Sequence, residues 1–168
     1  MSESESEDSL YLTVVSETER VPLILERVAQ FARRLGVQEA DGLLLVVREL
    51  LMNAIRHGNE SIRSRLALIR IVRRGGLFEV QVDDEGEGFD YESLELGLPE
   101  DPQSLAKRGL VLVHELSEEL AFERGGCRVR AIVDPEGKDR SMDRDGISFL
   151  REKYGREEAC VSQMGKSL

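Results

Sequence analysis

A line of polar side chains runs along a predicted helix between residues 41 and 57. Glu49, Asn53 and His57 follow one another at intervals of four, so they share one edge of that helix. Asparagine is unfavourable in a helix interior because its side chain competes for backbone hydrogen bonds. The apolar residues recur at helical spacing and define the adjoining packing face: Leu43, Leu44, Val47, Leu50, Leu51, Ala54 and Ile55. The polar line therefore borders either a cleft or bulk solvent, and the helix pattern alone is compatible with both.

A second stretch that could do chemistry is the acidic, glycine-rich VDDEGEGFD at residues 82 to 90. Asp84 can accept a hydrogen bond from an exocyclic amine, while Gly86 and Gly88 can approach a flat ligand closely or adopt positive φ. The same pattern also fits an ordinary acidic turn at the end of a strand. The abundance of carboxylates makes calcium a further alternative, although their spacing does not match an EF-hand loop.

The composition of the 168 residues fits one globular domain with appendages. A net charge of −10 argues against general nucleic-acid binding, since phosphate contacts need clustered Lys and Arg. No run approaches the roughly 18 apolar residues that span a bilayer, so we expect no membrane association. The N-terminal MSESESEDS lacks the features of a signal peptide, which indicates a cytoplasmic protein with Cys127 and Cys160 as free thiols.

The elements that must position these residues follow from periodicity and turn residues. We expect residues 1–9 to form a disordered acidic tail. The predicted order is then a strand (11–15), a helix ending at Gly36, the helix 41–57, a hairpin turning at residues 74–76, a helix (108–120) and a hairpin turning at residues 125–126. This order predicts an α+β fold, a two-layer α/β sandwich whose mostly antiparallel sheet is covered on one face by helices.

Two segments do not fit regular elements. Residues 86–106 are rich in Gly, Pro and acids and show no lasting period, which favours a lid or binding loop. Residues 134–168 change in composition and look like a C-terminal extension, to which the sequence assigns no role.

The order ExxxNAxxHGN, a hairpin ending in DxGxGFD, a lid and then Arg-Gly-Leu resembles the GHKL superfamily of ATP-binding proteins with the Bergerat fold. Within it, the chain looks most like the anti-sigma-factor serine/threonine kinases, small stand-alone regulators of bacterial sigma factors. The resemblance covers about residues 10–133, with NAIRHGN and DEGEGFD as its most specific parts.

The resemblance implies ATP and Mg²⁺ as cofactors. Asn53 would bind the magnesium ion that bridges the phosphates, and Glu49 would act as the general base or orient the acceptor. Asp84 would contact the adenine amine, with Gly86 and Gly88 shaping the base pocket. His57 belongs to the same motif, although a histidine at a helix C-terminus is also favoured by the helix dipole.

By the same resemblance, Lys107, Arg108 and Gly109 would form the phosphate-binding start of the third helix. The family usually has a glycine where this chain has Lys107, and the lid is shorter by a residue or two. Lys107 could obstruct wrapping of the phosphates by backbone, or could contact them directly through its charge.

The resemblance implies a kinase that phosphorylates a STAS-domain anti-anti-sigma partner and sequesters a sigma factor. The alternative is a nucleotide-dependent module that binds a sigma factor or STAS protein without transferring phosphate, which the altered third motif favours. A sensor histidine kinase would need a phosphoacceptor helix pair, for which residues 1–20 leave no room. A homodimer is suggested by the family alone.

Overall fold

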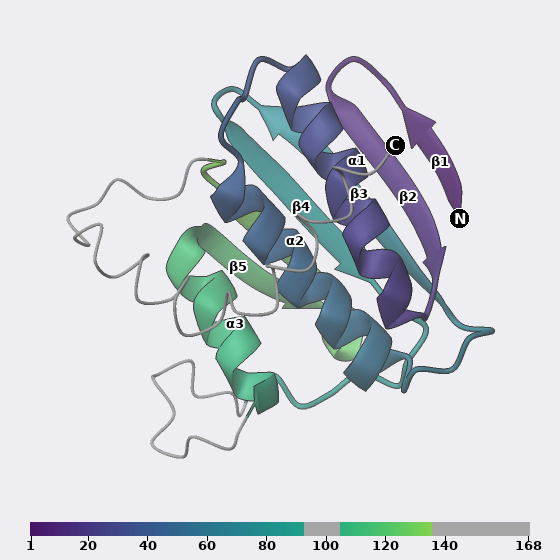
Figure 1. Ribbon diagram of the computed structural model, residues 1–168. Helices are drawn as coiled ribbons and strands as arrows, with labels where there is room; N and C mark the ends of the chain where they lie inside the picture. The colour runs from purple at the N-terminus through teal and green to yellow at the C-terminus, as the bar shows by residue number, and fades with distance from the viewer. Residues whose placement is uncertain (93–104, 136–168) are drawn as a thin grey trace. The chain divides into compact units, whose positions relative to one another are not determined.

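A computed structural model describes residues 1–92 and 105–135, apart from the side chains of residues 105–108. In this part of the chain, one sheet has the strand order β1-β2-β3-β4-β6-β5, and all neighbouring strands are antiparallel (Figure 1). The strands are β1 (Ser2–Glu5), β2 (Ser9–Val15), β3 (Leu66–Arg74), β4 (Leu77–Asp83), β5 (Ser117–Glu123) and β6 (Arg128–Val133). The α-helices are α1 (Val21–Arg34), α2 (Asp41–Asn53) and α3 (Leu105–Leu116). Short helical turns form η1 (Thr18–Arg20), η2 (Ala54–Gly58) and η3 (Arg124–Gly126).

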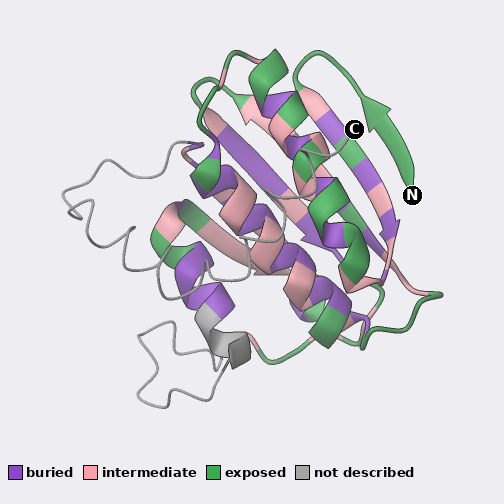
Figure 2. Cartoon of the chain, viewed as in Figure 1, coloured by how far each residue is buried: buried purple, intermediate pink, exposed green. Residues whose placement is uncertain are grey.

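The hydrophobic core lies between the sheet and the helices that cover one of its faces (Figure 2). Alternate strand residues point into it, as the buried Leu10, Leu12 and Val14 of β2 show. Phe31 of α1 meets Phe78 of β4 edge to face, with ring centroids 6.3 Å apart. Full burial of an aromatic or branched aliphatic side chain stabilises the fold by about 1.5–3 kcal/mol each. The predicted α+β sandwich is thus confirmed.

Glycine sets the turns that the sequence predicted. Gly75 has a φ of 64° in the tight turn between Arg74 and Leu77, which pair across β3 and β4. Gly36 has a φ of 84° just after α1, the left-handed conformation expected at a helix C-terminus. Both predicted hairpins are confirmed, the second joining β5 to β6 through η3.

The predicted disordered tail is wrong for residues 2–5, which form the edge strand β1. Serine and glutamate alternate there, so every glutamate lies on one side of the strand. Glu3 forms an ion pair with Arg27 of α1, and Glu5 pairs with Arg34 at 2.5 Å. Composition alone indicated disorder because it ignores this alternation and the basic helix that it meets.

The third helix differs from the prediction at both ends. It begins at Leu105 rather than Arg108 and ends at Leu116 rather than Leu120. Leu120 instead lies in β5, paired with Ala131 of β6. The sequence SEELAF fits a helix as well as a strand, and pairing with β6 decides between them, which is a tertiary effect.

Most of the predicted lid (93–104), the extension from residue 136 and Cys160 lie outside the described residues. Where the chain is described, no helix combines the length and apolar character that crossing a bilayer requires.

Candidate functional site

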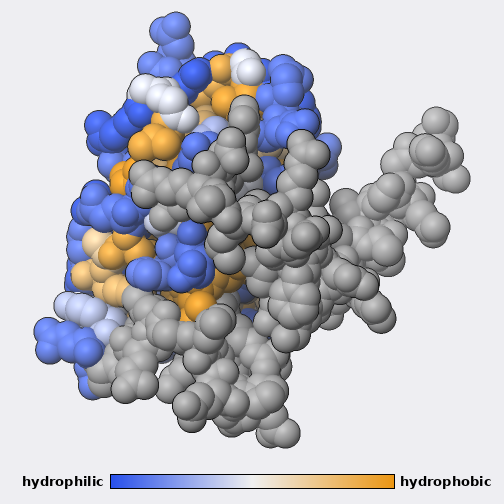
Figure 3. Space-filling model, turned by 90° about the vertical axis from the view of Figure 1, so that its left-hand side faces the viewer, coloured by the Kyte–Doolittle hydropathy of each residue, from blue (hydrophilic) through white to orange (hydrophobic). Residues whose placement is uncertain are grey.

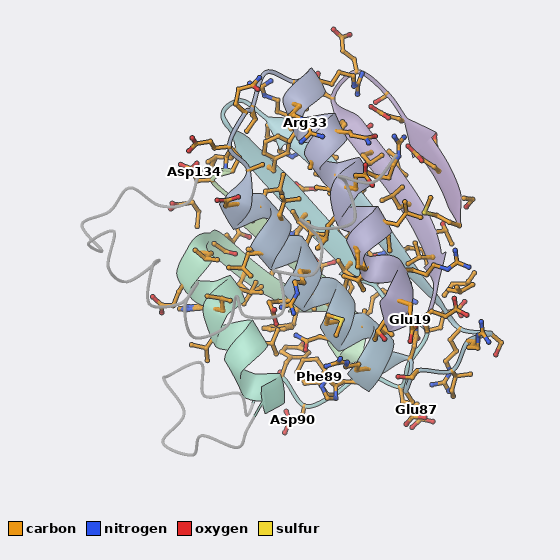
Figure 4. All side chains as sticks on the ribbon, in the orientation of Figure 1. Glu19, Arg33, Glu87, Phe89, Asp90 and Asp134 are labelled. Carbon is orange, nitrogen blue, oxygen red and sulfur yellow. The ribbon has the colours of Figure 1, made fainter. Side chains whose placement is uncertain are left out.

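A cavity of about 220 Å³ lies where the end of α2, the end of β4, α3 and η3 meet. Its lining residues are Leu50, Asn53, Ala54, His57, Gly58, Val82, Asp84, Gly88, Phe89, Leu110, Gly126 and Val129. Figure 4 shows Phe89 between the end of α2 and the start of α3. Mostly apolar walls with a few polar groups are the usual pattern of a small-molecule site.

The polar line of α2 meets this cavity. Asn53 ends α2, and His57 lies in the π-helical turn η2 that follows; both line the cavity. π-helical turns occur often at functional sites because they redirect side chains within a helix. Asn53 Nδ2 is buried and has no hydrogen-bond partner among the described residues. A buried amide without a partner is costly, so a polar ligand would satisfy it.

Glu49 lies one turn before Asn53, against α3. Its Oε1 accepts a hydrogen bond from Arg48 Nη1 at 2.5 Å, and both side chains are partly buried. A Cβ added to Gly109 would lie 2.5 Å from Glu49 Oε2 and 3.8 Å from Asn53 Nδ2. Glycine at this position of α3 therefore lets the helix approach both polar residues of α2.

Asp84 forms the other polar wall of the cavity. Its Oδ1 accepts a hydrogen bond from the Gly86 amide at 2.8 Å, and its own amide donates to the Cys127 carbonyl at 2.9 Å. Burial is the main cause that raises the pKa of the Asp84 carboxyl, with the charge of Asp83 adding to it. The carboxylate lies so close to Gly58 that a Cβ there would overlap with it. The close approach of Asp84 in DEGEGFD thus explains why NAIRHGN has a glycine at position 58.

The remaining glycines of the acidic loop also allow close backbone approach. A Cβ on Gly86 would overlap with the Gly58 carbonyl, and one on Gly88 would overlap with the Gly125 carbonyl. Gly88 has a φ of 80°, and the next amide, of Phe89, donates to the Gly125 carbonyl at 3.0 Å. The loop is therefore fastened between η2 and η3.

Asn59, the last residue of NAIRHGN, was missed as an individual site residue. It is fully buried, and Nδ2 donates to Ser16 Oγ at 2.8 Å and to the Leu66 carbonyl at 2.9 Å. Its Oδ1 accepts from the Glu85 amide at 2.8 Å. Asn59 thereby joins the end of β2, the start of β3 and the acidic loop, and fixes where Asp84 lies. A second asparagine six residues after Asn53, at the end of an apolar helix, was the available signal.

Phe89 was also missed as a site residue. Its ring meets Phe122 of β5 edge to face at 5.7 Å, and Tyr91 stacks on Phe122 at 5.5 Å. The Phe89 side chain is 41 % exposed although it lines the cavity. An aromatic wall held in this way offers a flat surface to a heteroaromatic ring.

The third motif is only partly described. Gly109 and Leu110 are buried, and Leu110 lines the cavity. Lys107 and Arg108 belong to the first turn of α3 by their backbone, while their side chains lie outside the described residues. Because α3 begins at Leu105, the free amides of its first turn precede Gly109.

The calcium alternative finds no support where the chain is described, since no group of three or more His, Cys, Asp or Glu could hold a metal there. Asp83 pairs with Arg128 at 2.6 Å and with Arg124 at 3.2 Å. Asp83 points to the opposite face of the sheet from Val82, whereas Asp84 reaches the cavity. The adjacent residues Asp83 and Asp84 therefore lie on opposite faces of the sheet.

A larger depression of about 760 Å³ lies beside η1 and contains none of the predicted site residues. Glu17 in its wall bonds Arg20 at 3.1 Å and also pairs with Arg63, which is 80 % exposed. These charges already compensate one another at the surface. The hollow lacks the apolar walls of the smaller cavity, and we assign it no ligand.

Figure 3 shows the side of the molecule that carries α3 and β5, where hydrophobic side chains lie beside hydrophilic ones. Across the described residues, the structure brings Asn53, His57, Asp84 and Gly88 to one cavity. Gly86 supports that loop, while Glu49 and Gly109 meet at the edge formed by α2 and α3.

Two comparisons with known proteins gave matches, one with a family model and one with solved structures. A family model described as a histidine kinase-like ATPase domain matches residues 14–133. One similar solved structure is the histidine kinase domain of a blue-light activated histidine kinase from Erythrobacter litoralis EL346, with 22 % identity and a TM-score of 0.45. That match covers 68 % of this chain and 61 % of the other, and at this similarity it carries no further argument. The search of curated proteins found no match.

Proposed function

The chain belongs to the histidine kinase-like ATPase domain family, and from that premise we propose that it is an ATP-dependent serine/threonine protein kinase acting as an anti-sigma factor. Its substrate is a STAS-domain anti-anti-sigma protein, and in its inhibitory state it sequesters a sigma factor in the cytoplasm. The observation that supports ATP as the ligand is the cavity itself, with Asp84 at one wall and the unpartnered Asn53 amide at another.

The adenine amine donates a hydrogen bond to Asp84, and Phe89 and Val82 supply apolar surface for the ring. The half-buried position of Asp84 removes competing water, which strengthens a hydrogen bond to it. Asp84 and Val82 at the β4 end of the cavity would therefore hold the base, and Asn53 and α3 would face the phosphates.

Asn53 fits a magnesium ion because its amide can present an oxygen when the side chain is turned over, and oxygen is the ligand that Mg²⁺ prefers. When bound, the ion neutralises charge on the phosphates. Gly109 lets α3 lie close to Glu49 and Asn53, and Lys107 and Arg108 belong to the first turn of α3, where their positive charges would contact the phosphates.

Glu49 would accept the proton of the serine hydroxyl or orient that hydroxyl for attack on the γ-phosphate, with ADP as the leaving group. Phosphoryl transfer depends mainly on positioning and on charge stabilisation, so one aligned carboxylate is sufficient. Glu49 Oε2 faces Gly109, and Oε1 is held by Arg48. The carboxylate is thus fixed at the edge where the end of the phosphate chain would lie.

A nucleotide-dependent binding module without kinase activity is the second candidate. The ion pair between Arg48 and Glu49 favours it, because Arg48 at 2.5 Å already occupies one of the carboxylate oxygens that would have to contact the serine hydroxyl. Lys107 in place of the usual glycine also favours the binding module.

The test combines the protein with ATP, Mg²⁺ and a STAS protein encoded beside its gene, followed by mass spectrometry for phosphoserine. We expect transfer by the wild type and by Glu39→Gln, an exposed glutamate just before the start of α2, at the opposite end of that helix from Asn53. Glu49→Gln should abolish transfer and preserve ATP binding. ATP binding without transfer by the wild type would establish the binding module instead.

A further inference from the structure

The edge strand β1 is unusual in what it contributes to the fold. All its residues, Ser2–Glu5, are exposed, and none carries an apolar side chain. It pairs with β2 through Glu3 opposite Leu12 and Glu5 opposite Leu10. Figure 1 shows it at the margin of the sheet, beyond β2. β1 is therefore held by backbone pairing and by ion pairs, and it adds no side chain to the hydrophobic core.

The charges come from one face of α1. Arg27 Nε donates to Glu3 Oε2 at 3.1 Å, and its Nη2 bonds the other oxygen, so the contact is bidentate. Arg27 also lies 3.9 Å from Glu5, which pairs with Arg34. Arg34 is further fixed over the Phe31 ring at 5.4 Å and donates to the Ser6 carbonyl at 2.8 Å. The two arginines form a recognition site for carboxylates at alternate positions of a strand.

We propose that the edge of β2, together with Arg27 and Arg34, is a docking site for an extended acidic segment of a partner protein. The segment would add to the sheet antiparallel to β2, as β1 does, and place carboxylates at alternate positions against the two arginines. Main-chain pairing at a sheet edge supplies affinity, and the side chains at alternate positions supply specificity. β1 is then an internal stand-in that covers the site until a partner segment replaces it.

The physical basis for exchange is the weakness of the contacts that hold β1. Its ion pairs are partly exposed to solvent, and such pairs are individually weak. A short polar strand at a sheet edge belongs to the parts of a protein that open most readily. β1 has an advantage over a free partner segment because it is tethered to the site, which gives it an effective concentration on the order of millimolar. This inference is independent of the proposed kinase activity, since it concerns a different edge of the molecule.

The test uses the full chain and the fluorescently labelled peptide SESESED, which copies residues 2–8. Glu3→Lys with Glu5→Lys places lysines against Arg27 and Arg34 and should release β1. We expect this variant to bind the peptide at least about tenfold more tightly than the wild type in fluorescence anisotropy. Reversing the arginines as well, with Arg27→Glu and Arg34→Glu, should remove that gain and protect β1 again.

The matched control is Glu19→Lys with Glu39→Lys, which changes net charge equally. Both glutamates are exposed, and within the described residues neither is bonded to Arg27 or Arg34. The control should bind the peptide as weakly as the wild type. Hydrogen exchange of the β1 amides, followed on each variant, reports whether the strand has opened.

Three results would overturn the inference. Open β1 amides without a gain in peptide binding would show that the edge does not accept an acidic strand. Unchanged protection of β1 in the lysine variant would show that the arginines do not hold it. A dimeric mass for the lysine variant would assign the open edge to a second copy of the chain.

Discussion

Replacing Asp84 by asparagine separates the charge of this residue from its shape. Asparagine keeps an oxygen that can accept the Gly86 amide, now bonded at 2.8 Å, so the loop should hold its position. What is lost is the ionised acceptor that we propose for the adenine amine. A hydrogen bond to a charged group is worth about 1.5–3 kcal/mol, which corresponds to a dissociation constant roughly 10- to 150-fold higher. Isothermal titration with ATP and Mg²⁺ measures this change directly.

The same substitution should stabilise the protein without nucleotide. Burial raises the pKa of Asp84, so the folded state holds this proton more tightly than the unfolded state. The stability that the protonated group contributes is complete below the unfolded pKa and is lost as pH rises through the folded pKa. Because asparagine does not ionise, Asp84→Asn removes this loss of stability at higher pH. Its melting temperature should exceed that of the wild type near pH 7, and the difference should shrink toward about pH 4.

Asp83→Asn is the matched control, because the neighbouring carboxylate lies on the other face of the sheet. It pairs with Arg128 and Arg124 and accepts a bond from Gln81 at 2.7 Å. Its replacement should cost about 1–3 kcal/mol of unfolding free energy and leave ATP affinity unchanged. The assignment of Asp84 would be refuted if Asp84→Asn bound ATP as tightly as the wild type while its fold was intact.

Three other substitutions test the site from different sides. Gly109→Ala puts a methyl group 2.5 Å from Glu49 Oε2, so ATP affinity and any phosphoryl transfer should fall at least about tenfold. The control is Gly76→Ala, because an added methyl group there has no neighbour within 4 Å. Equal ATP affinities of the two variants would contradict the packing argument. Asn59→Ala removes the three hydrogen bonds of a fully buried side chain and should lower the unfolding free energy by about 2–4 kcal/mol in urea titrations; a loss below about 0.5 kcal/mol would show that Asn59 is not a structural link. Phe89→Ala should raise the dissociation constant for ATP about three- to tenfold with little change in melting temperature, whereas an unchanged constant would remove Phe89 from the base pocket.

The sequence alone determined the layers of the fold and part of the candidate site. Alternating strands, apolar helical faces and glycine turns are local signals, and they predicted the α+β sandwich and both hairpins. The motif order also placed Asn53, His57, Asp84 and Gly88 on elements that the fold brings to one cavity. Spacing could do this because each motif stands at the end of a regular element, where the fold leaves little freedom.

Only the tertiary structure decided contacts between segments that are distant in sequence. The carboxylates of β1 become ordered because they meet Arg27 and Arg34, and residues 117–120 become a strand because β6 is there to pair with them. The same holds for Asn59, whose buried side chain joins three segments through hydrogen bonds that no local pattern specifies. Local propensity is a small free energy, and a long-range partner that satisfies a charge or a strand edge outweighs it.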